Sequence, residues 1–305
     1  MIELMIQDET AQLEAVVLGT ARSLGGTPDL AHVYDPKSRE HVLNGTFPQE
    51  SDLIQENEAF CAVLEKYNVQ VYRPDVLENI NQVYARDIGF VIDERFVVPN
   101  IISDREHEKD GIGYLTQRLD ESQLLFMPEG AHAEGGDVMP WKGRLFVGYS
   151  EEQDFEQYKV SRTNKAGLNF LEESFHNYEV IGFELQKSDT DARANALHLD
   201  CCFQPIGHDQ CIIYPGGFKN RSDYEWLVGE FGADRCIEIT QEEMYLMHSN
   251  VFSISPEIIV SEASFDRLNM ELEHRGFIVE RVKYAEVSKM EGLFRCSTLP
   301  LKRSY

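Results

Sequence analysis

The sequence predicts an α/β fold in which one unit of hairpin, helix and strand is repeated around a ring. Hairpin segments that begin with a polar residue recur with a period of about 50 to 60 residues, and helical patterns lie between them. A strand near the N-terminus can pair with one near the C-terminus, which would close the ring and remove free sheet edges. Repeats this long favour a propeller or a solenoid over two domains, so we expect residues 1–305 to form a single domain.

Four segments share a polar first residue, an apolar strand, a tight polar turn and a second apolar strand. They are "DIGFVIDERFVVPN" from Asp87, "DVMPWKGRLFVGYS" from Asp137, "DCCFQPIGHDQCIIYPGGF" from Asp200 and "NVFSISPEIIVSEASF" from Asn250. The expected turns are Asp93-Glu94, Lys142-Gly143, Gly207-His208-Asp209 and Ser255-Pro256. A fifth segment, "CSTLPLKR", opens with Cys296, and "LEAVVLGTA" at residues 13–21 is its expected partner strand.

Helical patterns separate the hairpins. "SDLIQENEAFCAVLEKY" has Ser51 as its expected cap and places Leu53, Phe60 and Leu64 on roughly one face. "SDYEWLVGEF" and "SFDRLNMELEHRG" repeat this design, and Gly276 is a stop signal for the second. Strand-like "VQVYRP" and "FIVERV" follow the first and last of these helices.

The chain carries 53 acidic and 28 basic residues, a formal net charge of −25. Such a charge disfavours nucleic acid and anionic membranes as partners, and it either attracts cations or only maintains solubility. The N-terminus shows no secretory signal and no run of 18 apolar residues occurs, so we expect a cytoplasmic protein with reduced thiols. The sequence leaves open whether the chain forms a homo-oligomer.

The cysteine and histidine spacing does not indicate a metal site. The six cysteines form no Cys-x-x-Cys pair. His198, His208 and Cys211 match no common zinc spacing. We therefore expect neither a metal nor a cofactor.

In a closed ring, the first residues of the repeats meet at a common axis. These residues are Asp87, Asp137, Asp200, Asn250 and Cys296, and other polar residues stand close to them in sequence, namely Arg86, Glu134, His198 and Arg295. One alternative is that Asp and Asn only start turns, which would explain one or two of the five. The additional polar residues favour a functional site.

"ANALHLDCC", residues 194–202, contains a candidate acid/base pair. Residues two apart in a strand share a face, so His198 and Asp200 should point the same way. A histidine beside a carboxylate is a candidate general acid/base, and the alternative is a polar pair at a strand end. Cys201 should enter the core, whereas Cys202 should lie on the polar face as a weaker nucleophile candidate.

Cys296 is the stronger nucleophile candidate. Arg295 and Ser297 flank it, and a nearby cation favours the thiolate; the alternative is another buried thiol. In "HAEGGDVM", Glu134 and Asp137 bracket two glycines that allow close backbone approach. Carboxylates, a histidine and a thiol without metal suit a cationic substrate that is attacked at carbon.

Seven motifs between about residues 84 and 303 together resemble the guanidine-modifying enzymes of the pentein superfamily. In order, they are "ARDIGFVI", "EGGDV", "LFVGYS", "SRTNKAG", "LHLD", "SNVFSI" and "RCSTLPLKR". That superfamily includes arginine deiminase, glycine amidinotransferase and dimethylarginine dimethylaminohydrolase, which share a five-bladed α/β propeller. The resemblance is specific as a set, whereas each motif alone is weak.

The resemblance implies a role for each residue of the expected site. It makes Cys296 the nucleophile and His198 the general acid/base, while Asp87 and Glu134 hold the guanidinium and Asp200 assists. It assigns Arg162, in "SRTN", to a substrate carboxylate. Further candidates for substrate binding are Asp137, Asn250, Arg86 and Arg295.

The implied reaction is hydrolysis of arginine, or of a related carboxylate-bearing guanidine, through a covalent cysteine intermediate. Transfer to an amine acceptor and hydrolysis of dimethylarginine are the alternatives. The residues from Met290 to Arg295 differ from the usual context of the deiminase cysteine, and Asp200 stands where dimethylarginine enzymes commonly have lysine. A non-enzymatic branch binds ribosomal subunits, but the retained Cys296 and His198 argue against a binding module.

Overall fold

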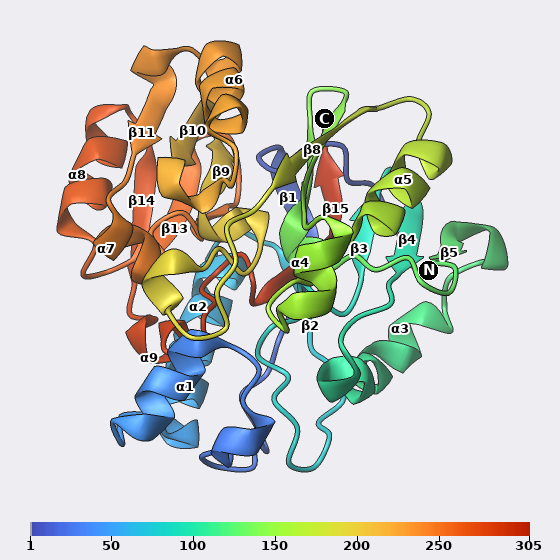
Figure 1. Ribbon diagram of the computed structural model, residues 1–305, viewed down its shortest axis with the longest axis vertical. Coiled ribbons are helices and arrows are strands. Elements are labelled where there is room, and N and C mark those ends of the chain that lie inside the picture. Colours follow the sequence, from blue (N-terminus) through green and yellow to red (C-terminus); the bar gives the residue numbers. More distant parts are fainter. Residues whose placement is uncertain (1) are drawn as a thin grey trace.

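The computed structural model describes residues 2–305, which form a mixed α/β fold of five small three-stranded sheets with helices around them (Figure 1). The sheets are β15-β1-β2, β3-β4-β5, β6-β7-β8, β9-β10-β11 and β12-β13-β14. The strands are β1 (Gln12–Leu18), β2 (Gln70–Tyr72), β3 (Phe90–Ile92), β4 (Arg95–Val98), β5 (Leu124–Phe126), β6 (Val138–Trp141), β7 (Arg144–Tyr149), β8 (Glu179–Glu184), β9 (Phe203–Ile206), β10 (Gln210–Ile213), β11 (Cys236–Glu238), β12 (Phe252–Ser253), β13 (Ile258–Glu262), β14 (Ile278–Val282) and β15 (Thr298–Ser304).

Every sheet has the same internal pattern. Its middle strand pairs antiparallel with one neighbour and parallel with the other. In four sheets the antiparallel pair is one of the predicted hairpins, and the parallel strand returns after a helical segment. In the remaining sheet β1 pairs with β15, with Val17 opposite Leu299, which confirms the predicted pairing of distant strands.

The tight turns follow from local backbone chemistry. Between β6 and β7, Lys142 and Gly143 have φ values of 48° and 78°. Positive φ at both central residues is the condition of the two-residue turn that matches strand twist in a hairpin. This turn places Trp141 opposite Arg144 and sets the register of the hairpin.

The helices are α1 (Pro36–Leu43), α2 (Glu50–Lys66), α3 (Gly113–Thr116), α4 (Glu152–Gln157), α5 (Lys165–Ser174), α6 (Arg221–Phe231), α7 (Gln241–Tyr245), α8 (Asp266–His274) and α9 (Ala285–Ser288). Helix α2 buries Leu53, Phe60 and Leu64 as predicted. The predicted cap at Ser51 is wrong, because the helix already begins at Glu50 and Gln49 stands at the cap position without a side-chain bond. Gly276, with φ 92°, follows α8 as predicted.

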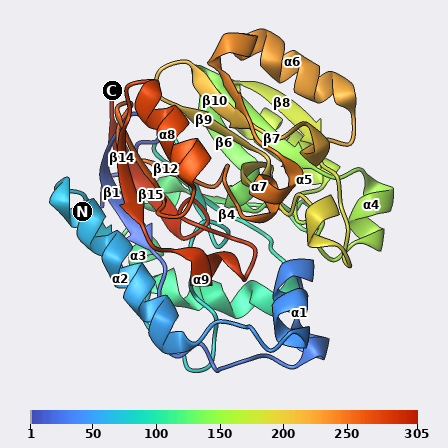
Figure 2. The same ribbon diagram turned by 90° about the vertical axis from the view of Figure 1, so that its left-hand side faces the viewer.

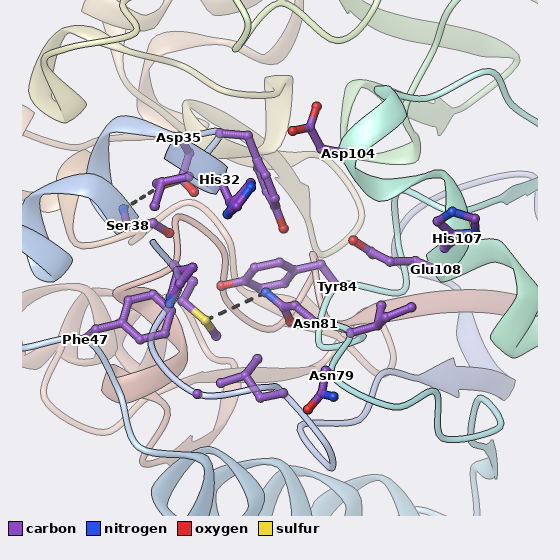
Figure 3. A pocket seen from close by; sticks show the side chains of 17 residues that line it. His32, Asp35, Ser38, Phe47, Asn79, Asn81, Tyr84, Asp104, His107 and Glu108 are labelled. Atoms are coloured by element: carbon purple, nitrogen blue, oxygen red, sulfur yellow. Dashed lines mark hydrogen bonds between the residues drawn. The ribbon is translucent and has the colours of Figure 1, made fainter. Parts of the chain in front are cut away.

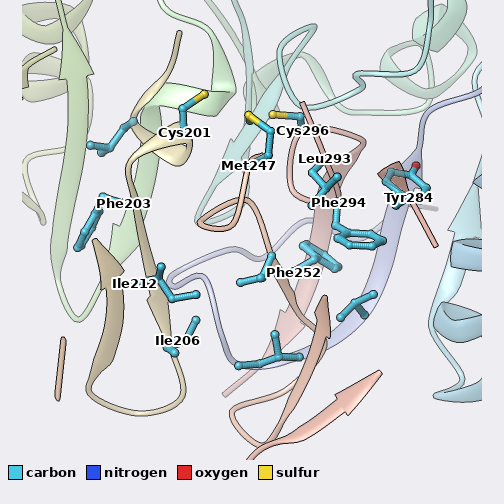
Figure 4. Close-up of a cluster of buried hydrophobic side chains, with 14 of the residues drawn as sticks. Cys201, Phe203, Ile206, Ile212, Met247, Phe252, Tyr284, Leu293, Phe294 and Cys296 are labelled. Carbon is cyan, nitrogen blue, oxygen red and sulfur yellow. The ribbon is translucent and has the colours of Figure 1, made fainter. Parts of the chain in front are cut away.

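Aromatic packing joins α2 to the sheets and to the segment that leads to β15. The ring of Phe60 lies 4.9 Å from that of Phe294 and 6.0 Å from that of Phe252, both edge-on. Figure 2 shows α2 on the outside of the fold beside the sheet of β1 and β15, and α2 also contacts β2. Figure 4 shows that Cys201 and Cys296 lie at one end of this buried cluster. The core therefore supports the segment that contains Cys296.

Within residues 2–305, no helix combines the length and the apolar content that are needed to cross a membrane.

Candidate active site

The side chain of Asn250 fixes the position of Cys296. Asn250 Oδ1 accepts hydrogen bonds from the backbone N–H groups of Leu293 and Cys296, each at 3.1 Å. Its Nδ2 lies 3.1 Å from Cys296 Sγ. Asp200 Oδ2 lies 3.5 Å from the same sulfur atom. The thiol is 2% exposed and points at an amide and a carboxylate.

Arg295 does not act on the thiol as the sequence suggested. Its guanidinium, wholly buried, forms ion pairs with Glu9 at 2.9 Å and Asp200 at 2.9 Å, and it also donates to the carbonyls of Gly136 and Val138. The N–H groups of Arg295 bond to Glu9, to Asp200 and to backbone carbonyls, and none of them bonds to Cys296. Arg295 therefore holds Asp200 in place, and its contact with a substrate stays a prediction.

Arg86 likewise supports the chain around Cys296. Its backbone N–H donates to the carbonyl of Cys296 at 3.0 Å, and its side chain donates to Arg295 O at 3.2 Å and Thr298 Oγ1 at 3.3 Å. Asp137 accepts from Thr163 Oγ1 at 2.7 Å and from Leu199 N at 2.8 Å. Arg86 and Asp137 thus form these bonds inside the protein, and their contact with a substrate stays a prediction.

The predicted strand through His198 and Asp200 is wrong. Leu199–Cys201 form a turn of 3₁₀ helix, and His198 is its N-cap residue. Successive side chains in such a turn point about 120° apart. His198 is therefore directed to Glu134 and Asp200 to Cys296. Cys202, expected on a polar face, is instead wholly buried against Gly217, and its Sγ lies 3.5 Å from the carbonyl of Leu199.

Several contacts position the imidazole of His198. Its Nε2 lies 2.8 Å from Glu134 Oε2, and its Nδ1 lies 3.8 Å from Asp87 Oδ1 without a hydrogen-bond partner among the described residues. Lys187 Nζ donates to the carbonyls of Ala196 and Leu197 at 2.9 and 2.8 Å, which anchors the chain just before His198.

Gly136 allows the imidazole of His198 to lie against the backbone. A Cβ atom on Gly136 would stand 2.6 to 2.9 Å from atoms of the His198 side chain. That separation is closer than van der Waals contact allows. One glycine of the "EGGD" motif is thus explained by close approach to the histidine.

Two buried arginines pair with the carboxylates beside His198. Arg162 Nη1 lies 3.1 Å from Glu134 Oε2, and its Nη2 donates to the carbonyl of Tyr34 at 3.2 Å. Arg105 Nη1 lies 2.7 Å from Asp87 Oδ2 and 3.7 Å from Glu134 Oε2. Sequence reasoning missed Arg105, whose only signal was Glu108 three residues later, a spacing that is also common on exposed helices.

The protonation states follow from burial and charge. Burial lowers the pKa of His198, but Asp87, Asp137 and Glu134 outweigh it, so its pKa is raised. Burial raises the pKa of Glu134, yet Arg162 and His198 bring it below the usual range. Burial, followed by the charges of Asp200 and Asp87, raises the pKa of Cys296 well above that of a free thiol. These shifts favour a protonated thiol and a positively charged imidazole in the resting site.

A cavity of about 260 Å³ lies beside this cluster (Figure 3). Its lining includes Tyr34, Asp35, Tyr84 and Glu108, and Figure 3 shows the side chains of Asp35, Tyr84 and Glu108 around the space. Glu108 forms a paired contact with Arg105 at 2.7 and 2.8 Å, and the carbonyl of Tyr84 accepts from Arg105 at 3.2 Å. One layer of side chains thus separates the cavity from the buried cluster.

Asp87, Glu134 and His198 also have the spacing of metal ligands. One candidate atom from each lies within 4.8 Å of the others. Arg105 and Arg162 already bring positive charge to the two carboxylates, so an added ion would compete with both guanidinium groups. Any added cation, whether a metal ion or an organic cation, would meet the same competition, so the spacing of these three side chains is not specific for a metal.

The family model for "N,N dimethylarginine dimethylhydrolase, eukaryotic" matches residues 44–303. The chain belongs to this family. Its members and its structural relatives are part of the pentein superfamily of guanidine-modifying enzymes, as the sequence motifs indicated. The match covers the strands of all five sheets except β1. It includes Asp87, Glu134, His198, Asp200, Asn250 and Cys296.

Individual relatives agree with this assignment. The Bacillus subtilis (strain 168) protein YkgA, itself uncharacterized, is 29% identical over 252 residues, which are 79% of this chain and 77% of YkgA. The N-terminal domain of ArgZ, a cyanobacterial arginine dihydrolase, superposes with a TM-score of 0.76 at 16% identity, covering 96% of this chain and 98% of that domain. Inosamine-phosphate amidinotransferase StrB1 from Streptomyces griseus gives 0.76 at 15% identity, with 100% and 98% covered. At identities of 15% and 16%, these two structures show the fold of this chain. They do not identify its substrate.

Proposed function

We propose that this protein hydrolyses the guanidinium group of arginine, or of a related carboxylate-bearing guanidine, through a covalent bond to Cys296. The observation that carries the proposal is one buried cluster in which the Cys296 thiol lies beside Asp200 while His198 lies between Asp87 and Glu134. A thiol, an acid/base and carboxylates for a planar cation are the groups that this reaction needs. No metal is required.

The substrate cation supplies what the resting site lacks. Burial, and after it the charges of Asp200 and Asp87, favour the protonated thiol at rest, and a guanidinium bound beside Asp87 and Asp200 offsets those charges. The pKa of Cys296 then falls, the thiol releases its proton to solvent, and the thiolate forms next to the carbon that it attacks. Binding and activation are thereby coupled, and the free enzyme has a poorly reactive nucleophile.

The chemical steps follow from this arrangement. Cys296 Sγ bonds to the central guanidinium carbon, and the His198 imidazolium gives a proton to the departing nitrogen, which leaves as ammonia. The neutral imidazole then takes a proton from water, and the resulting hydroxide attacks the amidino-thioether. The carbon–sulfur bond breaks, the proton of the new hydroxyl group passes to the departing sulfur, a ureido product leaves, and the thiol is restored.

Arg162 remains in the proposal as the partner of the substrate carboxylate. Its guanidinium already contacts Glu134 and the carbonyl of Tyr34, so a substrate carboxylate must share it with these groups. Arginine deiminase-type hydrolysis is our first choice. The alternatives are dimethylarginine hydrolysis, which is the activity in the family's name, and amidino transfer to an amine, which is the activity in the name of StrB1.

We also propose that the five sheets close into one five-bladed α/β propeller and that residues 1–305 act as one catalytic domain. The identical sheet pattern and the pairing of β1 with β15 support this closure. A non-enzymatic binding module is disfavoured, because a binding role alone gives no reason to bury a thiol, a histidine and four carboxylates together.

The direct test is incubation of the protein with arginine, agmatine and asymmetric dimethylarginine, with ammonia, methylamines and ureido products followed by mass spectrometry. A matched sample with an amine such as ornithine or glycine tests amidino transfer. We expect a ureido product and, on rapid acid quench, a mass increase on Cys296. Absence of any product and of any adduct with all three guanidines would refute the hydrolase proposal.

A further inference from the structure

Two sulfur atoms, those of Cys211 and Cys236, form a pair outside the cluster around His198 and Cys296. Strands β10 and β11 are parallel, and Cys211 stands opposite Cys236 in their register. The two Sγ atoms are 3.5 Å apart, with the Cys211 thiol directed at the Cys236 sulfur. Residues opposite each other on neighbouring strands have the Cα and Cβ separations that a disulfide needs.

The two thiols have different surroundings. Cys211 is wholly buried in the core, whereas Cys236 is partly exposed at the start of β11 and also contacts the carbonyl of Gly232 at 3.4 Å. Arg275 donates to Gln210 Oε1 at 3.0 Å and to Asp234 O at 3.1 Å, which brings its positive charge beside both strands.

The Cys211 thiol and the charge of Arg275 favour the thiolate at Cys236, whereas the hydrogen bond that Cys236 Sγ donates to the carbonyl of Gly232 needs the thiol proton. The hydrogen bond from Cys211 comes first and Arg275 adds to it, so the pKa of the Cys236 thiol is lowered although burial opposes this. Burial raises the pKa of the other five cysteines, which are Cys61, Cys201, Cys202, Cys211 and Cys296. Among the six, Cys236 combines access from solvent with a favoured thiolate, which is the pattern of a reactive cysteine.

We propose that Cys236 and Cys211 form a thiol–disulfide exchange site for small disulfides, with Cys236 as the attacking thiol and Cys211 as the resolving thiol. The Cys236 thiolate attacks one sulfur of the reagent RSSR, giving a mixed disulfide and releasing RS⁻. Cys211 then loses its proton and attacks the Cys236 sulfur, which releases the second RS⁻. The two protein thiols lose two electrons and two protons, and RSSR is reduced to two RSH.

This chemistry is separate from the reaction proposed at Cys296. Cys296 is buried and its thiol is protonated at rest, so a disulfide reagent should reach Cys236 first. The new bond would join β10 to β11 and enclose α6 between its ends. Neither sulfur belongs to the cluster around His198. The proposal for Cys236 and the proposal for Cys296 can therefore fail independently of each other.

The test uses the native full-length protein and oxidised glutathione. Samples are quenched over time with an alkylating reagent, digested with trypsin and analysed by mass spectrometry without reduction. We expect a disulfide between the peptides that contain Cys211 and Cys236, formed at least tenfold faster than any modification of Cys61 or Cys296. A urea-denatured sample shows the reactivity of the same thiols without the fold.

Two variants identify the roles, and a third serves as control. Cys211→Ser should accumulate a stable glutathione adduct at Cys236, because the resolving thiol is missing. Cys236→Ser should leave Cys211 reduced, and Cys61→Ser should behave like wild type. The proposal is overturned if native wild-type protein keeps Cys236 reduced, or if Cys61 or Cys296 reacts before Cys236; these wild-type results decide the matter even if a variant fails to fold.

Discussion

Nε2 of His198 lies 2.8 Å from Oε2 of Glu134, and both side chains are wholly buried. A carboxylate at this distance favours the charged imidazole and offsets the cost of its burial. His198 Nδ1 faces Asp87 at 3.8 Å, which acts in the same direction. These contacts favour the protonated imidazole, so we expect His198 to act first as a general acid and then as a general base.

This contact sets the expected pH dependence. The pKa of His198 is raised above its ordinary value of 6.5, so its contribution to stability is fully present below 6.5 and is lost as the pH rises through the folded-state pKa. Activity that needs the imidazolium should fall on the same alkaline side. Glu134→Gln should move the alkaline limb of kcat to lower pH and reduce kcat, as measured by ammonia release between pH 5 and 10. If the alkaline limb of kcat does not move in this variant, the group that titrates there is not His198.

Gly136→Ala should impair catalysis with little loss of fold. The added Cβ would overlap the His198 side chain at 2.6 to 2.9 Å and push the imidazole from its place. A displacement of about 1 Å can cost roughly 100-fold in rate, so we expect kcat to fall at least about tenfold. Gly229→Ala in α6 is the matched control, because its Cβ meets nothing within 4 Å and should leave kcat unchanged. Equal kcat values in both variants would contradict the assignment of His198.

Cys296→Ala should abolish turnover and the covalent adduct while the protein stays folded. The substitution removes only a sulfur atom, and Asn250 keeps its bonds to the backbone of Cys296 and Leu293. Cys202→Ala should retain turnover, because that thiol is buried against Gly217 and lies outside the cluster. Product formation by mass spectrometry and thermal unfolding give both readouts. Activity lost at Cys202 and kept at Cys296 would reverse our assignment.

Substrate preference should follow the number of N–H donors. Dimethylation of one guanidinium nitrogen removes two donors, and a hydrogen bond to a charged group contributes roughly 1.5–3 kcal/mol. We therefore expect kcat/KM for arginine to exceed kcat/KM for asymmetric dimethylarginine by a factor of about 10² to 10⁴. A tenfold preference for dimethylarginine would instead show that Asp200, already paired with Arg295, does not contact the guanidinium.

Arg162→Ala should raise KM for arginine more than for agmatine, which lacks the carboxylate. The expected increase is about tenfold or more, the value of one charged hydrogen bond. Because the change also leaves Glu134 with one partner fewer, Arg162→Lys serves as the milder variant. If both variants raise KM equally for arginine and agmatine, Arg162 acts only through Glu134.

Chelation should leave activity intact. Although Asp87, Glu134 and His198 have the spacing of metal ligands, two arginines already pair with the carboxylates. We expect unchanged kcat after dialysis against EDTA. Loss of activity that zinc or manganese restores would assign this trio to a metal.

The repeating hairpins were predictable because their signals are local. Turn residues such as Lys142 and Gly143 fix a hairpin within a few positions, and alternating apolar residues mark the paired strands. The pairing of β1 with β15 was predictable because five repeats left one strand at each end without a partner. The polar residues at the start of the repeats then had to lie near one another.

The orientation of individual side chains was not predictable in the same way. A 3₁₀ turn at Leu199–Cys201 and a strand are both compatible with "LHLDC", and only the contacts with Asp137 and Lys187 select the turn. Arg295 is adjacent to the nucleophile in sequence, yet Glu9 draws it into an ion pair across the fold. Arg105 comes from a segment without a motif. Charges that pair over long sequence distances leave no local pattern.

The order of synthesis gives the placement of Cys296 a further consequence. Cys296 lies two residues before β15, which of the fifteen described strands is the last to leave the ribosome, and β15 must find β1 at the other end of the chain. Until the chain has been synthesised as far as Cys296, Asn250 and Asp200 have no thiol to hold. We therefore expect a nascent chain that stops before Cys296 to be unable to carry out the proposed reaction.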